Sequence, residues 1–350
     1  MTLRVLHVPG IVGGNPGCLA RAERALGLES RCLTNDPNPH GYPVDEQVPG
    51  PAEGRFRYEM QRWRLLLRAL REFDIIHFNF GRTLFPQALP LDLPLLKAAG
   101  KRIFMTYQGD DARQGDYCRA HFDITFATRV PDGYYSPASD AAKRRSIARV
   151  ARYATRIYAL NPDLLHVLPD KARFLPYANV DLTAWRPVPW PDNPVPVVVH
   201  APTHRQVKGT DVVLQAAEQL RREGEKFELV LIENLRRDEA RRAYERADLA
   251  IDQLFAGWYG GFAVEMMALG KPVLCYLRES DLKFLPPAQR EEMPIIAVRP
   301  DTLAATLREW LRAPRTRLEE IGRRSRLYVE KWHDPLKIAA QLKADYEAAG

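Results

Sequence analysis

The chain has little cysteine and no long hydrophobic run. Its 350 residues include four cysteines, at positions 18, 32, 118 and 275, and none belongs to a Cys-x-x-Cys pair. This spacing argues against a zinc site and against an oxidised scaffold held by disulfides. The apolar stretches are of strand length, far below the roughly 20 residues that span a membrane. Because the first residues also lack the apolar core of a signal peptide, we expect a protein of the reducing cytoplasm.

Metal-ligand spacings and nucleic-acid motifs are missing as well. Asp74, His77 and the adjacent Asp110 and Asp111 follow no usual ligand pattern. No stretch resembles an RNA- or DNA-binding module. We therefore expect no metal, no cofactor beyond the substrates and no nucleic-acid partner.

Positive charge is concentrated in the first half of the chain. Residues 1–190 contain 26 Lys and Arg against 19 Asp and Glu, which accounts for the whole net charge of +7. Residues 191–350 contain 25 of each sign and are neutral. A basic surplus of this kind attracts phosphate groups or anionic lipid.

Strand and helix patterns alternate in two rounds. Short apolar strands separated by helices of about 10–15 residues are typical of parallel sheets with helices on both faces. Closely spaced prolines over residues 186–196 separate the two rounds and indicate a stiff linker. We predict an α/β protein with two Rossmann-like domains, residues 1–188 and residues 189–335.

A basic loop follows the first strand of the second round. Arg205 and Lys208 stand between this strand and the next helix. Ligands of open α/β sheets bind at the carboxyl ends of strands, and a helix N-terminus favours an anion. The two side chains can therefore clamp a diphosphate and stabilise the charge that it gains on leaving. The alternative is a pair of solvated loop cations.

A glycine-rich turn follows the strand pattern at residues 249–252. Gly260 and Gly261 permit close backbone approach to a phosphate at the start of the helix that opens with Phe262. We predict Gly260, Gly261 and Phe262 as donor-binding residues. Glu265, in the first turn of that helix, can accept hydrogen bonds from ribose hydroxyls. Alternatively, its carboxylate only complements the helix dipole.

Together these segments resemble the retaining GT-B glycosyltransferases of the family 4 type. The resemblance rests on Arg205-x-x-Lys208-Gly209 and on the stretch from Gly260 to Val273, and it covers most of the second half. It implies that the basic pair holds the donor diphosphate, that Glu265 holds the ribose, and that the glycine turn meets the phosphates or the sugar. It also implies a GT-B fold of two facing Rossmann-like domains, with a last helix, residues 336–350, that packs back on the first domain.

The remaining motifs fit this family less closely. The family often has a second glutamate eight positions before Glu265, where this chain has Gly257, and we assign no role to Gly257. The loop with Gly13 and Gly14 resembles the family's glycine loop over the donor, or it is an ordinary turn.

On the acceptor side we predict Gln108, where the family often has histidine, and Asp110. The alternative for both is a role as turn-forming residues only.

Residues 55–71 combine arginine with an apolar stripe. Met60, Trp63, Leu67 and Leu70 recur at helical spacing. They predict a helix whose apolar side faces the core and whose arginines are solvated. The alternative is a surface against anionic lipid, where a lipid-linked acceptor would sit.

Together with the basic pair and the absence of metal-ligand spacings, the resemblance implies a metal-independent, retaining glycosyltransferase. It would move a sugar from a nucleotide-diphosphate sugar, UDP- or GDP-linked, to a hydroxyl of a sugar or lipid-linked acceptor. The expected setting is cell-surface polysaccharide or glycolipid synthesis in the cytoplasm, with peripheral association at the inner face of the membrane. The alternatives are a nucleotide-sugar epimerase or phosphorylase on the same fold and a non-catalytic nucleotide-sugar binding subunit.

Overall fold

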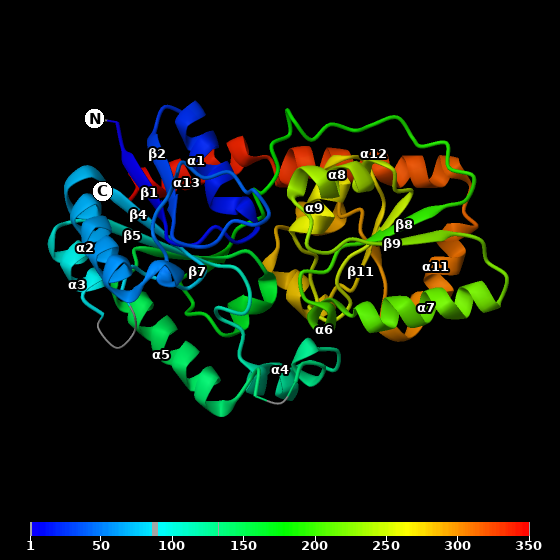
Figure 1. Cartoon of the computed structure of the whole chain (residues 1–350), viewed down its shortest axis with the longest axis horizontal. Helices are drawn as coiled ribbons and strands as arrows, with labels where there is room; N and C mark the ends of the chain where they lie inside the picture. Colours follow the sequence, from blue (N-terminus) through cyan, green and yellow to red (C-terminus); the bar gives the residue numbers. More distant parts are fainter. Residues whose placement is uncertain (1, 86–89, 132, 350) are drawn as a thin grey trace. The chain divides into compact units, whose positions relative to one another are not determined.

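The structure is a computed structural model, and it describes residues 2–85, 90–131 and 133–349. The chain divides into two compact units (Figure 1). The first consists of Met1–Asp116, Tyr135–Asn179 and Asp334–Gly350, and the second of Tyr117–Tyr134 and Val180–His333. The predicted boundary at residues 188 and 189 lies within the second unit, which also includes a short segment from the first half of the sequence.

The first unit is built on a parallel sheet. Within the described residues it has seven strands in the order β3-β2-β1-β4-β5-β6-β7. The strands are β1 (Arg4–Val8), β2 (Glu29–Thr34), β3 (Glu46–Gln47), β4 (Ile75–Asn79), β5 (Arg102–Tyr107), β6 (Arg156–Ala159) and β7 (Ala172–Phe174). The central strands are buried on both faces, which explains why they read as continuous apolar runs rather than as an alternation.

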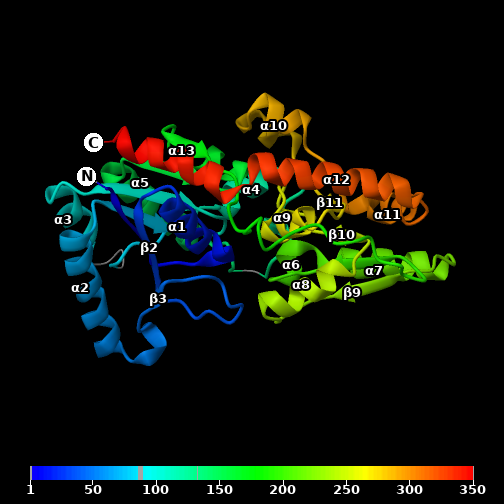
Figure 2. The same ribbon diagram turned by 90° about the horizontal axis from the view of Figure 1, so that it is seen from above.

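Helices cover both faces of this sheet. One hydrophobic core lies between the sheet and the helices α2 (Arg55–Glu72), α3 (Asp92–Ala98) and α5 (Pro137–Tyr153). The other lies between the sheet and the helices α1 (Asn15–Ala25) and α13 (Pro335–Glu347). The red α13 therefore packs beside the blue α1, although the two helices come from opposite ends of the chain (Figures 1 and 2).

A buried polar network fastens α13 to the first sheet. The hydroxyl of Tyr346 bonds to Nδ1 of His77 at 2.6 Å and donates to Oε1 of Glu23 at 3.1 Å. The other oxygen of Glu23 bonds to Nε2 of His7 at 2.9 Å. Desolvation, together with the neighbouring His7, holds the pKa of His77 well below its usual value. Each of these side chains is fully buried, so each depends on its partners in the network.

The second unit is built on a smaller parallel sheet. Within the described residues its five strands have the order β12-β11-β10-β8-β9. They are β8 (Val197–His200), β9 (Glu228–Leu231), β10 (Leu249–Ile251), β11 (Val273–Cys275) and β12 (Ile296–Ala297). The helices of this unit include α6 (Arg205–Lys208), α7 (Thr210–Arg222), α8 (Arg237–Glu245), α9 (Gly261–Ala268), α10 (Pro287–Glu291), α11 (Leu303–Leu311) and α12 (Arg315–Trp332). The helix α4 (Gly115–His121) spans the point at which the chain first enters this unit.

One prediction about α2 is wrong. Met60, Trp63 and Leu67 were expected to face the core, yet they are 37%, 43% and 47% exposed. The buried side of the helix carries Leu65, Leu66 and Ala69 together with Arg62. Arg62 tolerates burial because its guanidinium donates to the carbonyl of Leu84 at 2.6 Å and pairs with a glutamate one turn earlier. In the described part of the chain, no helix is long and apolar enough to cross a lipid bilayer.

Candidate functional site

The order of the second sheet places a ligand site beside two of its strands. The strand order reverses between β8 and β10, which are neighbours in the sheet but not in the sequence. Ligands of open α/β sheets bind outside the carboxyl ends of the strands at such a reversal. The segment after β8 carries the predicted basic pair, and the segment after β10 begins with Asp252 and Gln253. Strand order alone therefore brings these two segments to one edge.

Lys208 lies at this edge and joins the two segments. Its Nζ donates to the side-chain oxygen of Gln253 at 2.8 Å and lies 3.4 Å from Oδ1 of Asp252. Asp252 is almost fully buried, so the nearby ammonium compensates a carboxylate that has lost its water. Gly209 ends the single turn of α6 with a φ of 78°, a left-handed conformation that glycine adopts without strain.

The glycine turn before α9 meets the same carboxylate. The backbone N–H of Gly260 donates to Oδ2 of Asp252 at 2.6 Å. A Cβ atom at Gly260 would lie 3.0 Å from Nζ of Lys208. The absence of a side chain there lets the ammonium approach the turn, so the structure brings together the predicted residues Lys208, Gly260 and Gly261. The ring of Phe262, the next predicted residue, packs on Tyr244 at 5.1 Å between ring centroids.

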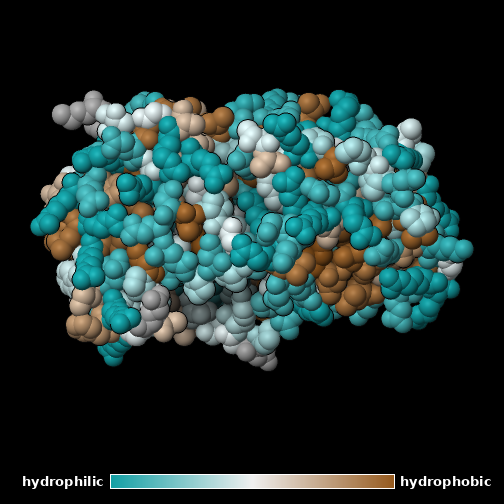
Figure 3. All heavy atoms as spheres, turned by 45° about the horizontal axis from the view of Figure 1, so that its top comes forward, coloured by the Kyte–Doolittle hydropathy of each residue, from teal (hydrophilic) through white to brown (hydrophobic). Residues whose placement is uncertain are grey.

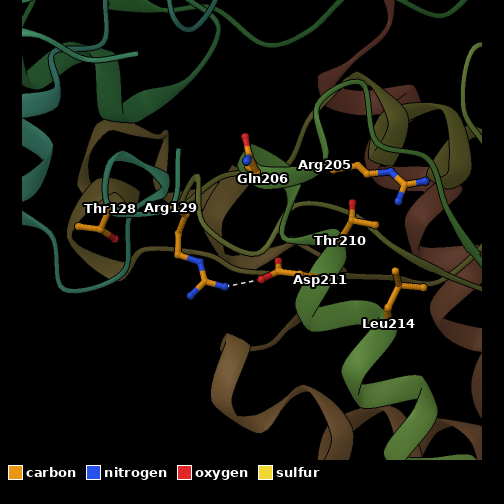
Figure 4. Close-up of a pocket in the computed structure, with 7 residues that line it drawn as sticks. All are labelled: Thr128, Arg129, Arg205, Gln206, Thr210, Asp211 and Leu214. Atoms are coloured by element: carbon orange, nitrogen blue, oxygen red, sulfur yellow. Dashed lines mark hydrogen bonds and ion pairs between the residues drawn. The ribbon is translucent and has the colours of Figure 1, made fainter. Parts of the chain in front are cut away.

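Arg205 points in another direction. Its side chain is 57% exposed, and its Nε donates to Oε1 of Glu233 at 2.8 Å as one half of a two-bond ion pair. The structure therefore does not join Arg205 to Lys208 at one point. Close to α6 is a cavity of about 500 Å³ (Figure 4). It is lined by Thr128, Arg129, Arg205, Gln206, Thr210, Asp211 and Leu214.

Glu265 is held by a cation that sequence reasoning missed. Oε1 of Glu265 accepts a hydrogen bond from Nε of Arg237, on α8, at 2.7 Å. Both side chains are largely buried, and the guanidinium of Arg237 also lies 4.8 Å from the ring centroid of the buried Trp185. The ring and the carboxylate together fix the guanidinium, which in turn fixes the orientation of the carboxylate. No sequence signal distinguished Arg237 from the other arginines of its helix.

At Gly257 the backbone leaves no room for a side chain. Gly257 has a φ of 81°, and a Cβ atom there would lie 2.5 Å from the guanidinium of Arg278. That guanidinium donates to Asp281 at 2.7 Å and to the carbonyl of Ile124 at 3.0 Å, and lies 3.7 Å from the ring centroid of Phe122. Arg278 thus ties the segment Tyr117–Tyr134 to the rest of the second unit.

The predicted residues of the first half lie in the first unit. Gly13 and Gly14 both have positive φ values, 65° and 72°, and directly precede α1. A Cβ atom at Gly14 would lie 2.7 Å from the ring of Tyr42, whereas one at Gly13 would meet no atom within 4 Å. The loop is thus tightly packed at Gly14 and open at Gly13.

The acceptor-side candidates follow β5. Gln108 is buried, and among the described residues its Nε2 has no hydrogen-bond partner. Oδ1 of Asp110 accepts a hydrogen bond from the hydroxyl of Tyr135 at 2.5 Å. Asp111 accepts from the backbone N–H groups of Gln108 and Gly109, at 3.0 and 2.6 Å.

Burial raises the pKa of the Asp111 carboxyl to about 6, although these two backbone hydrogen bonds lower it.

Potential metal ligands do not gather in the described residues. No group of three or more His, Cys, Asp or Glu side chains there is placed to hold a metal ion. Asp252 and Gln253 are further candidate residues of this site that sequence reasoning missed. The signal that could have found them is their position, because polar residues at the end of a buried strand are candidates for a ligand site.

Comparison with known structures gives the fold. The chain is similar over 99% of its length to 98% of a sucrose-phosphate synthase from Thermosynechococcus elongatus, with 17% identity and a TM-score of 0.66. It is also similar to an α-glucosyltransferase in complex with UDP and a 13-mer DNA, with 10% identity, coverage of 99% and 100%, and a TM-score of 0.62. A third match is a putative UDP-N-acetylglucosamine 2-epimerase from Listeria monocytogenes, with 12% identity, coverage of 99% and 96%, and a TM-score of 0.58.

No family model and no curated protein sequence matches the chain. At these identities the structural likeness concerns the fold alone. The predicted α/β class with two parallel, helix-covered sheets of the GT-B kind is confirmed.

Proposed function

We propose that the protein is a retaining, metal-independent glycosyltransferase that uses a nucleotide-diphosphate sugar, UDP- or GDP-linked. The observation that carries the proposal is the meeting of Lys208, Asp252 and Gly260 at the strand reversal of the second sheet. A cation beside an open glycine turn suits a donor diphosphate, because the charge on that group grows as it leaves. Glu265, held by Arg237, supplies a carboxylate for the ribose hydroxyls.

The reaction requires a single exchange of bonds at the anomeric carbon. The bond from this carbon to the phosphate oxygen breaks, and a bond to the acceptor oxygen forms on the same face of the sugar. The acceptor's proton passes to the leaving phosphate oxygen, so the electron pair and the proton are both accounted for. The protein then has to position the reactants and stabilise the phosphate rather than supply a strong base. Lys208 fits the second role, and Arg205 is proposed to join it by exchanging its ion pair with Glu233 for the phosphate. Gln108 and Asp110 are proposed to position the acceptor.

The acceptor is proposed to be a sugar or a lipid-linked sugar of a cell-surface polysaccharide or glycolipid, used in the cytoplasm. An epimerase is the second candidate, because the same fold occurs in a putative nucleotide-sugar epimerase. A non-catalytic binding subunit is the third, because Gly257 and Gln108 stand where the resembling family has glutamate and histidine.

One experiment separates these candidates. Purified protein is incubated with UDP- and GDP-sugars and with sugar acceptors, in excess EDTA, and the products are resolved by mass spectrometry and NMR. A glycosyltransferase gives transferred or slowly hydrolysed sugar with α-linkage preserved from an α-linked donor. Epimerised donor would support the second candidate, and tight donor binding without turnover the third. Activity that EDTA abolishes and a divalent metal restores would overturn the metal-free part of the proposal.

A further inference from the structure

The helix α2 presents a hydrophobic stripe outward instead of toward the core. The stripe consists of Phe56, Met60, Trp63 and Leu67, which are 76%, 37%, 43% and 47% exposed. Steps of four, three and four residues place them on one side of the helix. Figure 3 shows hydrophobic side chains at the surface on the side of the first unit where Figure 1 places α2 and α3. Exposed apolar groups gathered in this way mark an interaction surface.

A row of arginines borders the stripe. Arg57, Arg64 and Arg71 follow one another at intervals of seven residues, and each is exposed. Within the described part of the chain none of the three has an ion-pair partner, whereas Arg68 pairs with Glu46 at 3.0 Å. The stripe and these three arginines are called the α2 outer face below.

The rigid packing of the helix holds the outer face in place. The opposite side of α2 contributes Leu65, Leu66 and Ala69 to the core of the first unit. Trp63 itself is supported from below, because its ring contacts the edge of the buried Phe85 ring at 4.8 Å between centroids. The face is therefore a preformed surface that needs no folding step before it binds a partner.

The chemistry of the α2 outer face matches one partner best. An apolar stripe beside unpaired arginines needs a partner that offers both a hydrophobic layer and negative charge. Nucleic acid offers phosphates but leaves the stripe in water, and a protein partner would need an apolar patch and carboxylates placed to match this one face. An anionic bilayer offers both, with acyl chains beneath a layer of phosphates, and tryptophan favours that interface.

We propose that the α2 outer face docks on the surface of an anionic lipid bilayer, with the apolar stripe among the upper acyl chains and the arginines at the lipid phosphates. The helix lies along the membrane and does not span it. This inference goes beyond sugar transfer and does not depend on the donor site, which lies in the second unit. It gives the first unit a direct route to an acceptor that is anchored in the same bilayer.

The test uses the full-length protein and two kinds of vesicle. One kind contains phosphatidylcholine alone, and the other contains roughly one third anionic phosphatidylglycerol. We expect the protein to sediment with the anionic vesicles at low salt, to bind the neutral ones far less, and to be released by added salt. The fluorescence of Trp63 should shift to shorter wavelength on binding, and a Trp63→Phe variant should lose that part of the shift.

Two sets of substitutions probe the two halves of the face. Replacing Arg57, Arg64 and Arg71 by Gln should weaken binding to anionic vesicles on the order of 100-fold, because each arginine contributes about 1 kcal/mol at such a surface. The double variant Phe56→Ser and Leu67→Ser should mainly reduce the binding that remains at high salt, where the arginine contribution is screened. Thermal unfolding and nucleotide affinity should be unchanged in both, because the altered side chains are exposed and belong to the first unit, whereas the proposed donor residues belong to the second.

Matched variants in other parts of the surface serve as controls. The triple change of Arg222, Arg312 and Arg323 to Gln removes the same charge from the second unit, and Leu327→Ser removes an equally exposed leucine. These controls should bind vesicles as the unaltered protein does. Equal loss in the controls, equal binding to neutral vesicles, or no binding to either kind would overturn the proposal. Concentration-dependent dimerisation that the Phe56 and Leu67 changes abolish would instead assign the face to a second copy of the chain.

Discussion

At the scale of single residues, the ion pair of Arg237 and Glu265 allows the most direct test of the proposed donor site. We expect Glu265→Ala to weaken nucleotide binding by about 1.5–3 kcal/mol, the usual worth of hydrogen bonds to a charged group. Arg237→Ala should have a smaller effect of the same sign, because the carboxylate remains but loses the group that orients it. Isothermal titration with UDP and GDP measures both losses.

Arg241→Ala is the control for Arg237. Arg241 lies 5.2 Å from the ring of the same Trp185 but pairs with Glu245, so its removal should leave nucleotide affinity unchanged. Unchanged affinity in Glu265→Ala would remove this residue from the site.

The two predicted cations should differ in what their removal does to stability. Arg205 is exposed and solvent screens its ion pair, so Arg205→Ala should unfold at the same urea concentration as the unaltered protein. Lys208→Ala leaves the buried Asp252 carboxylate without its cation, which costs about 3–5 kcal/mol when a buried pair is broken. Both variants should lose transfer activity on the order of 100-fold. Urea unfolding and steady-state kinetics on the same samples separate the two effects, and full activity in Arg205→Ala would exclude it from the reaction.

Asp111 should make stability depend on pH. Because burial raises its folded-state pKa above the usual value of 3.8 to about 6, its contribution to stability is greatest below that usual value. It is lost as the pH rises through about 6. The variant Asp111→Asn keeps an oxygen for the backbone N–H groups but does not titrate. The difference in unfolding free energy between the two proteins, measured from pH 4 to pH 7.5, should therefore favour the variant increasingly, and a constant difference would contradict the shifted pKa.

At the scale of helices and strands, the sequence predicted what local patterning controls. The strand pattern at residues 249–252 and the helix expected to open with Phe262 match β10 and α9 to within one residue, because each combines an apolar pattern with a clear start or stop. The 18-residue α12 was missed, since its many arginines and glutamates hide a buried side of only a few residues. The apolar side of α2 was assigned to the core, because periodicity reveals that a helix has an apolar side and not what covers it.

For the candidate site, too, the sequence predicted what lies close together along the chain. Its motif residues stand next to predicted strands, so Lys208, Gly260 and Glu265 could be named. The partners Arg237, Asp252 and Arg278 come from other elements, and only the folded sheet brings them into contact. The direction of Arg205 toward Glu233 likewise depends on a strand that lies one position further along the sheet.

The network beneath α13 predicts the effect of one lost hydroxyl. Tyr346→Phe leaves Nδ1 of His77 and Oε1 of Glu23 without this partner, and unsatisfied buried groups cost about 1–3 kcal/mol. We expect the free energy of unfolding of the first unit, measured in urea, to fall by that amount. The same change at Tyr153, which is half-buried at the end of α5 in the same unit, should cost much less. Equal stability of the Tyr346 variant would mean that α13 is held by its apolar contacts alone.

At the scale of the whole molecule, the two units should respond differently to nucleotide. Each has its own sheet and core, so two unfolding transitions are expected in calorimetry. A ligand that binds only the native donor site stabilises by about 2.7 kcal/mol at a concentration of 100 times its Kd. UDP or GDP should therefore raise the transition of the second unit more than that of the first, and the Glu265→Ala change should abolish the difference. A panel of nucleotides also identifies the base.

The segment Tyr117–Tyr134 has a consequence for protein engineering. The carbonyl of Ile124 and the ring of Phe122 both contact Arg278. The second unit therefore includes residues that lie well before its first strand, β8, in the sequence. A chimera that exchanged residues 180–333 alone for those of a related protein would keep the segment Tyr117–Tyr134 but lose Arg278, which binds it. In residues 180–333 produced in isolation, the guanidinium of Arg278 would lack both the Phe122 ring and the carbonyl of Ile124. Grafting of the second unit onto the first unit of another protein therefore requires both of its pieces of chain, Tyr117–Tyr134 and Val180–His333.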